Sequence, residues 1–324
     1  MLIKKYICII SLLVTICSLA ACGKNESVNI RVASLKGATS LGLLDMMDKA
    51  EQGNAEGSYE FIMATAADEI VPQMIKGDVD IALLPANAAS NLYQKSGKAV
   101  QVVDINTLGV LYMVTGSDDI KSVNDLKGKT IYSTGKGATP EAAVMSVLEG
   151  NGLTDKEYEI EFKAEASEVV ALLAENPDAV GVLPQPFVTA ALMQNDKLKI
   201  VIDLNEEWNS IYGGNGAKMV TGVTVVRTEF AQNHPAAVET FIKEHKASAD
   251  AVNGNVDAAA ALAVKKEIIA KEPIAKKAIP LCNIVCITGE DMKTSLSGYL
   301  NSLYEFKPEL IGGSVPEDDF YYVR

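Results

Sequence analysis

IYSTGKGATPEAAVM occupies residues 131–145, and a related stretch, IRVASLKGATSLGLL, occupies residues 30–44. Both contain Lys-Gly-Ala-Thr, at 36–39 and at 136–139, one hundred residues apart. Each tetrapeptide follows a strand-like apolar run and precedes a helix-like stretch. The chain is therefore predicted to build a strand, a tight turn and a helix twice.

Three further pairs of segments repeat in the same order at nearly the same spacing. They are YEFIMATAADEIV (59–71) with YEIEFKAEASEVV (158–170), DVDIALLPANAAS (78–90) with DAVGVLPQPFVTA (178–190), and AVQVVDI (99–105) with LKIVIDL (198–204). A period near one hundred residues is too long for a solenoid repeat. Strand-like runs that alternate with helical stretches instead predict an α/β fold with two lobes of like topology, each a mainly parallel sheet flanked by helices.

The segments after the second repeat are assigned to the first lobe. One strand-like stretch, GAKMVTGVTVVRTEF, is followed by three helical ones at 234–253, 257–270 and 289–306. Those helices need a sheet to cover, so the chain is expected to cross between lobes twice through a two-strand hinge. The predicted division is a signal peptide at 1–21, a lipidated cysteine and tether at 22–27, lobe 1 at 28–106 plus 223–324, and lobe 2 at 107–222.

The first residues are typical of an export signal. MLIKK is cationic, and the apolar run after it ends in Leu-Ala-Ala-Cys-Gly at 19–23. This pattern resembles a bacterial lipobox and predicts acylation of Cys22, with the protein anchored by lipid to the outer face of the cell membrane. The alternative is an ordinary apolar signal region that contains a cysteine. The formal net charge of −13 argues against nucleic acid as a partner.

Ligands of open parallel sheets bind beyond the carboxyl ends of the strands, where helix N-termini present free N–H groups. Two facing lobes would place several such ends around one cleft, which favours a ligand with an anionic or strongly accepting group. Thr39 and Thr139 are predicted N-caps, with Pro140 at the first helical position. The predicted ligand-binding residues are Lys36, Gly37, Ala38, Thr39, Thr65, Pro85, Asn87, Asn106, Thr134, Lys136, Gly137, Ala138, Thr139, Gln185 and Phe187. The alternative for each lysine is a solvated connector, and Trp208 either stacks on a ligand or packs locally.

The sequence offers little for catalysis. His234 stands at a helix start, and His245 lies in the charged stretch KEHKAS, so both are expected to face solvent. The motifs G-x-S-x-G and H-E-x-x-H do not occur. Cys282 and Cys286 are expected to be reduced and packed, with a disulfide as the alternative, and the stretch LCNIVCI offers too few ligands for a metal ion. We therefore expect no catalytic residues, no metal and no cofactor.

Several motifs resemble the solute-binding proteins of ABC importers, in particular the nitrate/sulfonate/taurine-type group, which includes binders of thiamine-pyrimidine precursors. They are the lipobox, SVNDLKGKTIYSTGKGATPEAA, LLPANAASNLY and NHPAAVETFIKEHKASADAVN. The resemblance implies a type II periplasmic-binding fold that closes around one small molecule and delivers it to a permease driven by a cytoplasmic ATPase. We expect a monomer. The group also resembles a pyrimidine synthase, but the Cys-Cys-Cys-Phe-Cys run of that enzyme is missing here.

Two questions stay open at this point. A small sulfonate-like anion suits helix N-termini, whereas a flat heterocycle suits aromatic and amide side chains such as Phe187 and Gln185. The same fold also serves either transport or the presentation of a ligand to a membrane sensor.

Overall fold

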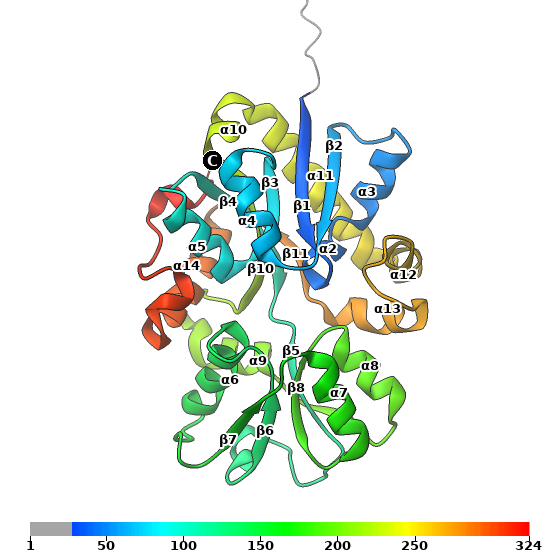
Figure 1. Cartoon of the computed structure of the whole chain (residues 1–324), viewed down its shortest axis with the longest axis vertical. Coiled ribbons are helices and arrows are strands. Elements are labelled where there is room, and N and C mark those ends of the chain that lie inside the picture. Colours follow the sequence, from blue (N-terminus) through cyan, green and yellow to red (C-terminus); the bar gives the residue numbers. More distant parts are fainter. Residues whose placement is uncertain (1–27, 324) are drawn as a thin grey trace, which may run out of the picture.

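The structure is a computed structural model that describes residues 28–323. Two lobes lie one above the other, each with a sheet at its centre (Figure 1). The sheet of lobe 1 has six strands in the order β11-β4-β10-β3-β1-β2. The strands are β1 (Asn29–Leu35), β2 (Ser58–Ala64), β3 (Ile81–Pro85), β4 (Val100–Leu108), β10 (Val220–Arg227) and β11 (Ile284–Ile287).

The sheet of lobe 2 has five strands in the order β7-β6-β8-β5-β9. They are β5 (Leu111–Thr115), β6 (Thr130–Ser133), β7 (Glu159–Phe162), β8 (Val180–Pro184) and β9 (Lys199–Asp203). The order β2-β1-β3-β10-β4 in lobe 1 corresponds to β7-β6-β8-β5-β9 in lobe 2. The internal repeat of the sequence is thus a repeat of topology.

In each sheet, the strand that forms directly after the chain crosses from the other lobe runs antiparallel to its neighbours. β10 runs antiparallel to β3 and β4, and β5 runs antiparallel to β8 and β9. The pairs β1–β2, β1–β3, β6–β7 and β6–β8 are parallel. The predicted fold class is confirmed: two α/β lobes joined through two crossing strands.

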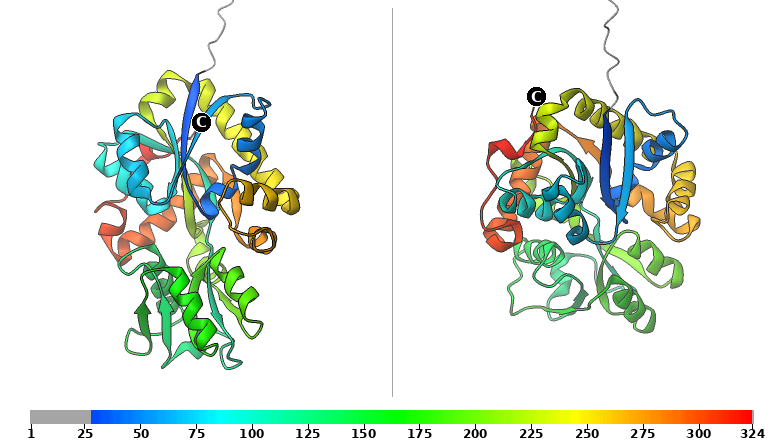
Figure 2. Two further views of the ribbon diagram at one scale, coloured as in Figure 1. Left: turned by 45° about the vertical axis from the view of Figure 1, so that its right-hand side comes forward. Right: turned by 45° about the horizontal axis from the view of Figure 1, so that its top comes forward.

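Helices cover both faces of the first sheet, as the two further views in Figure 2 show. One face packs against α4 (Ala67–Lys76), α5 (Ala86–Lys95) and α14 (Gly289–Phe306). The other face packs against α3 (Leu44–Glu51), α10 (Thr228–Asn233) and α11 (Pro235–Gly254). The short α2 (Ala38–Leu41), α12 (Val256–Lys265) and α13 (Glu272–Ala278) form a second cluster with α11.

Lobe 2 repeats this layering with fewer helices. α6 (Thr139–Gly150) and α9 (Leu204–Tyr212) cover one face of its sheet, and α7 (Ala166–Glu175) and α8 (Phe187–Gln194) cover the other. Trp208 of α9 is 1% exposed, and its ring meets that of Tyr299 in α14 edge-on at 5.4 Å. Trp208 therefore packs between the lobes, which is the second of its two predicted roles.

The crossing between lobes is braced by polar contacts. The side chain of Asn283 donates to Gly109 O at 2.6 Å, and Asn205 Oδ1 accepts from Gly109 N at 3.2 Å. The hydroxyl of Tyr112 donates to Leu281 O at 2.8 Å. In the sheet of lobe 1, β4 runs to Leu108 and β10 begins at Val220. The division of the chain into domains at 106/107 and 222/223 stays a prediction.

Four local predictions were wrong. The N-cap residues are Gly37 and Ala138 rather than Thr39 and Thr139. Neither threonine caps its helix, because other side chains bind each turn. In the first turn Ser40 Oγ donates to Gly37 O at 3.0 Å, and in the second the Glu141 carboxylate accepts from Gly137 N at 2.5 Å. Since Thr139 is the first helical residue, Pro140 takes the second position.

The fourth error concerns His245, which does not face solvent. It is 0% exposed, and its Nδ1 lies 3.0 Å from Asp104 Oδ2. The charged neighbours in KEHKAS suggested an exposed face, but His245 belongs to the buried face of α11, together with Val238, Phe241, Ser248, Ala249 and Val252.

The two later cysteines are free thiols, as expected. Burial raises the pKa of the Cys282 thiol to about 12 and also raises that of Cys286. The predicted signal peptide and the lipidation of Cys22 fall outside the described residues. Within residues 28–323, no helix has the length and apolar character that a membrane crossing requires.

Candidate functional site

The first Lys-Gly-Ala-Thr turn joins β1 to α2 at the carboxyl end of the sheet. Lys36 N donates to Ala64 O at 2.9 Å, which ties the turn to the end of β2. Thr39 is 7% exposed. A Cβ added at Gly222 would lie 2.6 Å from Thr39 Cγ2 and 2.4 Å from Asn106 Oδ1. The structure therefore brings Thr39 and Asn106 together on either side of Gly222, beside the hinge.

Asn106 is held by its own neighbours. Its Nδ2 donates to Thr224 Oγ1 at 3.3 Å, and its Oδ1 accepts from Thr107 Oγ1 at 2.9 Å. The residue is almost completely buried. These contacts favour a role in the hinge strand for Asn106 over direct contact with a solute.

Gln185 marks the corresponding place in lobe 2, directly after β8. Its backbone N–H donates to Val110 O at 3.1 Å, and its Oε1 accepts from Thr189 Oγ1 at 2.8 Å. The side chain is buried in a residue that is 3% exposed, yet Nε2 has no partner within residues 28–323. A buried amide without an acceptor is costly, so Nε2 is available to an incoming acceptor.

The two halves of this candidate site are close in space. Val110 lies four positions after Asn106, and an extended chain spans at most about 3.6 Å per residue, or roughly 14 Å here. Asn106, beside the turn after β1, and Gln185, at the end of β8, are therefore linked through this short segment at the hinge.

The second Lys-Gly-Ala-Thr turn differs from the first. The Glu141 carboxylate already accepts from Gly137 N, so an acidic group occupies the first turn of α6. Lys136 is exposed, with its ammonium 5.9 Å from the centre of the Phe162 ring. A Cβ at Gly137 would lie 3.7 Å from Lys307 Nζ of lobe 1. This turn thus faces lobe 1, but its helix end is not free for an anion.

The remaining predicted residues fall into two groups. Thr65 is bound to its own helix, since Glu69 Oε1 accepts from both Thr65 Oγ1 and Thr65 N. Lys36 pairs with Glu267 at 3.3 Å. The others lie at strand ends or helix starts, and their side chains make no hydrogen bond within residues 28–323: Gly37, Ala38, Pro85, Asn87, Thr134, Ala138, Thr139 and Phe187.

The helices after the two Leu-Pro pairs have freer N-termini than α6. α5 follows Pro85 and α8 follows Pro186, and neither carries an acidic residue in its first turn or a side-chain cap. Asn87 lies in the first turn of α5, and Phe187, 39% exposed, begins α8. Sequence analysis gave most weight to Lys-Gly-Ala-Thr, whereas the structure points to the Leu-Pro repeats. The lack of Asp or Glu after each Leu-Pro was the signal that could have shown this.

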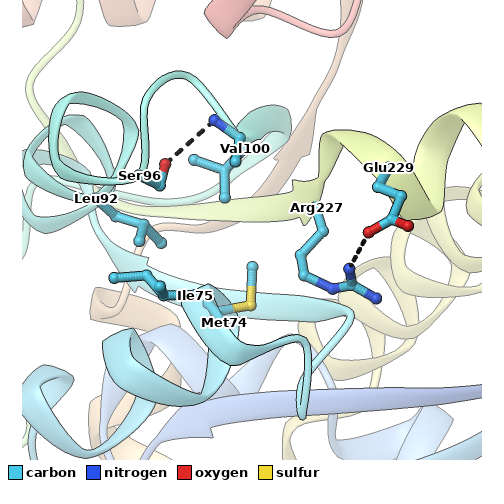
Figure 3. Close-up of a pocket in the computed structure, with 8 residues that line it drawn as sticks. Met74, Ile75, Leu92, Ser96, Val100, Arg227 and Glu229 are labelled. Carbon is cyan, nitrogen blue, oxygen red and sulfur yellow. Dashed lines mark hydrogen bonds and ion pairs between the residues drawn. The ribbon is translucent and has the colours of Figure 1, made fainter.

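A cavity of about 140 Å³ lies elsewhere in lobe 1, between α4, α5 and the far ends of β4 and β10 (Figure 3). Met74, Ile75, Leu92 and Val100 give it an apolar lining. The guanidinium of Arg227 at its edge is engaged by Asp80 at 2.9 Å and Glu229 at 3.1 Å. Because it opens at the opposite end of the sheet from the hinge, this cavity is not part of the candidate site.

Comparisons with known proteins agree with this geometry. The sequence model of a family described as "ABC transporter, phosphonate, periplasmic substrate-binding protein" matches residues 52–210. A comparison with curated proteins finds no match. An ABC transporter structure from Parabacteroides distasonis is 22% identical, with a TM-score of 0.76 over 91% of this chain and 99% of that one.

Two more distant structures show how widely the fold is used. The periplasmic aliphatic sulphonate binding protein SsuA from Escherichia coli is 14% identical, with a TM-score of 0.71 over 90% of each chain. The desulfurization enzyme DSZB is 12% identical, with a TM-score of 0.65 over 91% of this chain and 96% of that one. Such identities show a shared fold, and the fold includes both binding proteins and an enzyme.

The family match and the two-lobed fold together define the class. Residues 52–210 match the periplasmic substrate-binding proteins of ABC transporters, a class that works outside the cytoplasm and delivers small ligands to a permease, and the whole chain shares the fold of such proteins. The predicted resemblance to ABC solute-binding proteins is confirmed. The matching sequence model is that of phosphonate-binding relatives, and sulfonate-binding proteins are among the structural neighbours.

Proposed function

We propose that this protein captures a small solute with an anionic or strongly accepting group between its lobes. Closure about the two crossing strands would enclose the solute, and the closed form would hand it to a permease driven by a cytoplasmic ATPase. Ligand would act by stabilising the closed population.

The observation that carries this proposal is the unpartnered Nε2 of Gln185. It is a buried donor beside the hinge, at the start of the segment that leads into α8. The N-termini of α5 and α8 add backbone N–H groups that no acidic side chain engages in the first turn. Donors without acceptors favour an oxyanion over a cation.

A sulfonate or phosphonate fits these donors best. Each presents several oxygens on one tetrahedral centre, so that a side-chain amide and helix N–H groups can bind different oxygens together. The names of the matching family and of the Escherichia coli neighbour refer to phosphonate and aliphatic sulphonate, which supports this choice. We further propose that the solute is bound without chemical change.

A flat heterocycle is the second candidate, because Phe187 is a large apolar side chain that stays 39% exposed at the start of α8. An exposed ring beside a free amide could stack on a base-like solute and bind its polar edge. In this case Gln185 and Phe187 would contribute more than the helix ends.

The proposal is tested by thermal unfolding against a panel of solutes. The panel holds nitrate, taurine, alkanesulfonates, alkylphosphonates, aminopyrimidines and thiamine. A solute at one hundred times its dissociation constant stabilises the folded state by about 2.7 kcal/mol. A shift with a sulfonate or phosphonate supports the anion proposal, and a shift with heterocycles alone supports the second candidate.

The variant Gln185→Ala then tests the site. Loss of one hydrogen bond to a charged group should weaken binding by about 1.5–3 kcal/mol, measured by calorimetry. Gln73→Ala is the matched control, because the Gln73 amide donates to Glu69 O on an exposed part of α4. Equal affinity in both variants would remove Gln185 from the site.

We also propose that the protein acts as a monomer held at the membrane by acyl chains on Cys22. Acyl chains contribute about 0.8 kcal/mol per buried methylene. Mass spectrometry of the N-terminal peptide from membrane fractions would show the lipid, and a Cys22→Ser chain should be released from the membrane.

A further inference from the structure

Three side chains of metal-binding types converge behind the hinge strand. Asp104 comes from β4, His245 from α11 and Cys286 from β11, and one donor atom from each lies within 4.8 Å of the others. The expectation that LCNIVCI lacks ligands for a metal counted sequence neighbours only. Asp104 and His245 are 141 positions apart, so the fold alone brings them to Cys286.

The cluster is largely buried, and its imidazole makes few hydrogen bonds. Asp104 Oδ2 lies 3.0 Å from His245 Nδ1, and Asp104 Oδ1 accepts from Thr224 Oγ1 at 2.7 Å. Both Asp104 and His245 are fully buried. His245 Nε2 has no hydrogen-bond partner in the described part of the chain. Only Asp104 therefore orients the ring through a hydrogen bond.

We propose that Asp104, His245 and Cys286 bind a transition-metal ion of the Zn²⁺ class. One nitrogen, one sulfur and one carboxylate oxygen form a donor set that suits Zn²⁺ and related ions. Mg²⁺ and Ca²⁺ are excluded by the same set, because they require mainly oxygen ligands.

The observed spacing requires only a small adjustment on loading, in which the nitrogen and oxygen ligand atoms move slightly apart. Zinc bonds to nitrogen and oxygen are about 2.0–2.2 Å long, so tetrahedral geometry separates those two ligand atoms by about 3.3–3.5 Å. Nδ1 and Oδ2 are already 3.0 Å apart. The ion takes the place of the proton between them, the Cys286 thiolate forms the third bond, and water takes the fourth position. The imidazole stays neutral, because its single proton moves from Nδ1 to Nε2, and the thiol proton passes to solvent.

The same residue types form the nucleophile, base and orienting acid of thiol enzymes. That alternative is disfavoured here, because Asp104 and His245 are both completely shielded and a substrate cannot reach the imidazole. A metal ion is small enough to enter beside Cys286, which is only partly buried.

A bound ion would join three elements next to the hinge. β11 pairs with β4 through Ile284 and Thr107, and Asn283 just before β11 donates to Gly109 O. α11 covers these strands through His245. The ion would therefore stiffen the lobe 1 side of the hinge, and this inference does not depend on which solute the protein binds.

The test is titration with Co²⁺, whose thiolate complexes absorb in the near ultraviolet. The full chain is purified in detergent with Cys8, Cys17 and Cys22 replaced by serine, so that Cys282 and Cys286 are its thiols. We expect one ion per chain and a thiolate-to-cobalt band. Cys286→Ser should abolish the band and weaken binding by more than the 10–100-fold typical of outer-shell partners.

Cys282→Ser is the matched control, because Cys282 is buried four positions away and its Sγ contacts Ala278 O at 3.2 Å. It should keep the band. Zn²⁺ should raise the melting temperature of the parent and of Cys282→Ser but not of Cys286→Ser, and Cys286→Ala serves as a second variant should serine prevent folding. No band at excess Co²⁺, or a band that survives in the Cys286 variants, would overturn the proposal.

Discussion

The first Lys-Gly-Ala-Thr turn is enclosed by its lobe, whereas the second lies at the surface. In lobe 1 the four-residue α2 places Thr39 against Gly222 and the hinge strand. In lobe 2 the same four residues lead into the twelve-residue α6, with Gly137 exposed and its N–H donating to Glu141. Identical residues thus brace the hinge in one lobe and form an open, self-capped helix end in the other.

The lobes also differ in buried charge at equivalent positions. Asp80 in DVDIALLP accepts from Arg31 at 2.7 Å and from Arg227 at 2.9 Å. In the corresponding stretch of lobe 2, DAVGVLP, the equivalent residue is Ala179. At this position lobe 1 therefore has buried ionic contacts that lobe 2 cannot form.

Asp80→Asn should have the largest effect on stability. Two arginines would lose a buried partner, and we expect a loss of about 2–4 kcal/mol in the free energy of unfolding, measured with urea at pH 7. Asp78→Asn, an exposed neighbour, is the control. A loss no larger than that of the control would contradict the difference between the lobes.

The same variant predicts a pH dependence. Burial alone would raise the pKa of Asp80, but hydrogen bonds from Arg31 and Arg227 outweigh it and lower the pKa. The stabilisation is therefore complete above the unfolded-state pKa and is lost as the pH falls through the folded-state pKa. Unfolding at decreasing pH should show a shallower acid-induced loss in Asp80→Asn than in the parent.

Gly222→Ala tests the enclosed turn and should come next in size. The added methyl would lie 2.4 Å from Asn106 Oδ1 and 2.6 Å from Thr39 Cγ2. Such overpacking costs about 1–3 kcal/mol, measured by urea unfolding. Gly254→Ala is the control, since no atom of residues 28–323 outside its immediate neighbours lies within 4 Å of a Cβ there. Equal stability of the two variants would mean that the turn is not packed against the hinge.

The glycines of the two turns should respond differently to asparagine. Gly37 has φ 155° and ψ −162°, a region that essentially only glycine adopts, at a cost of about 1–3 kcal/mol for other residues. Gly137 has φ 71°, in the left-handed region that asparagine tolerates. Gly37→Asn should therefore lower the melting temperature clearly, and Gly137→Asn only slightly. The reverse order would contradict the assigned turn conformations.

Glu141→Gln should have the smallest effect on stability. It removes a negative charge from the N-terminus of α6, a loss of about 0.3–1 kcal/mol. If an anionic solute approaches this turn, calorimetry should also show tighter binding in the variant. Glu149→Gln, at the other end of the same helix, is the control, and equal affinities would place the solute away from α6.

The fold could be predicted from the sequence because the evidence for it is the order of many elements and does not depend on single residues. Four strand–helix pairs in one order at one spacing define a repeated topology, whatever the exact element ends are. The assignment of the late helices to lobe 1 followed from the need of their apolar faces for a sheet, and α11, α12 and α14 lie there.

The candidate site could be predicted less well, because its details depend on contacts between residues that are far apart in the sequence. The burial of His245 follows from Asp104, and the packing of Trp208 follows from Tyr299 of the other lobe. No local sequence pattern indicates either of these contacts. Glu141, by contrast, lies two residues after Thr139, and its carboxylate accepts from Gly137 N. This local cap could have been predicted from the sequence, but the cap was assigned to the threonine instead.

The central claim is that solute binding closes the lobes about the hinge. Small-angle X-ray scattering of the protein with and without the solute that stabilises it most tests this directly. We predict a smaller radius of gyration with solute, and no such change in Gln185→Ala at the same solute concentration. An unchanged radius in the fully bound parent protein would contradict hinge closure and with it the proposed mechanism of capture.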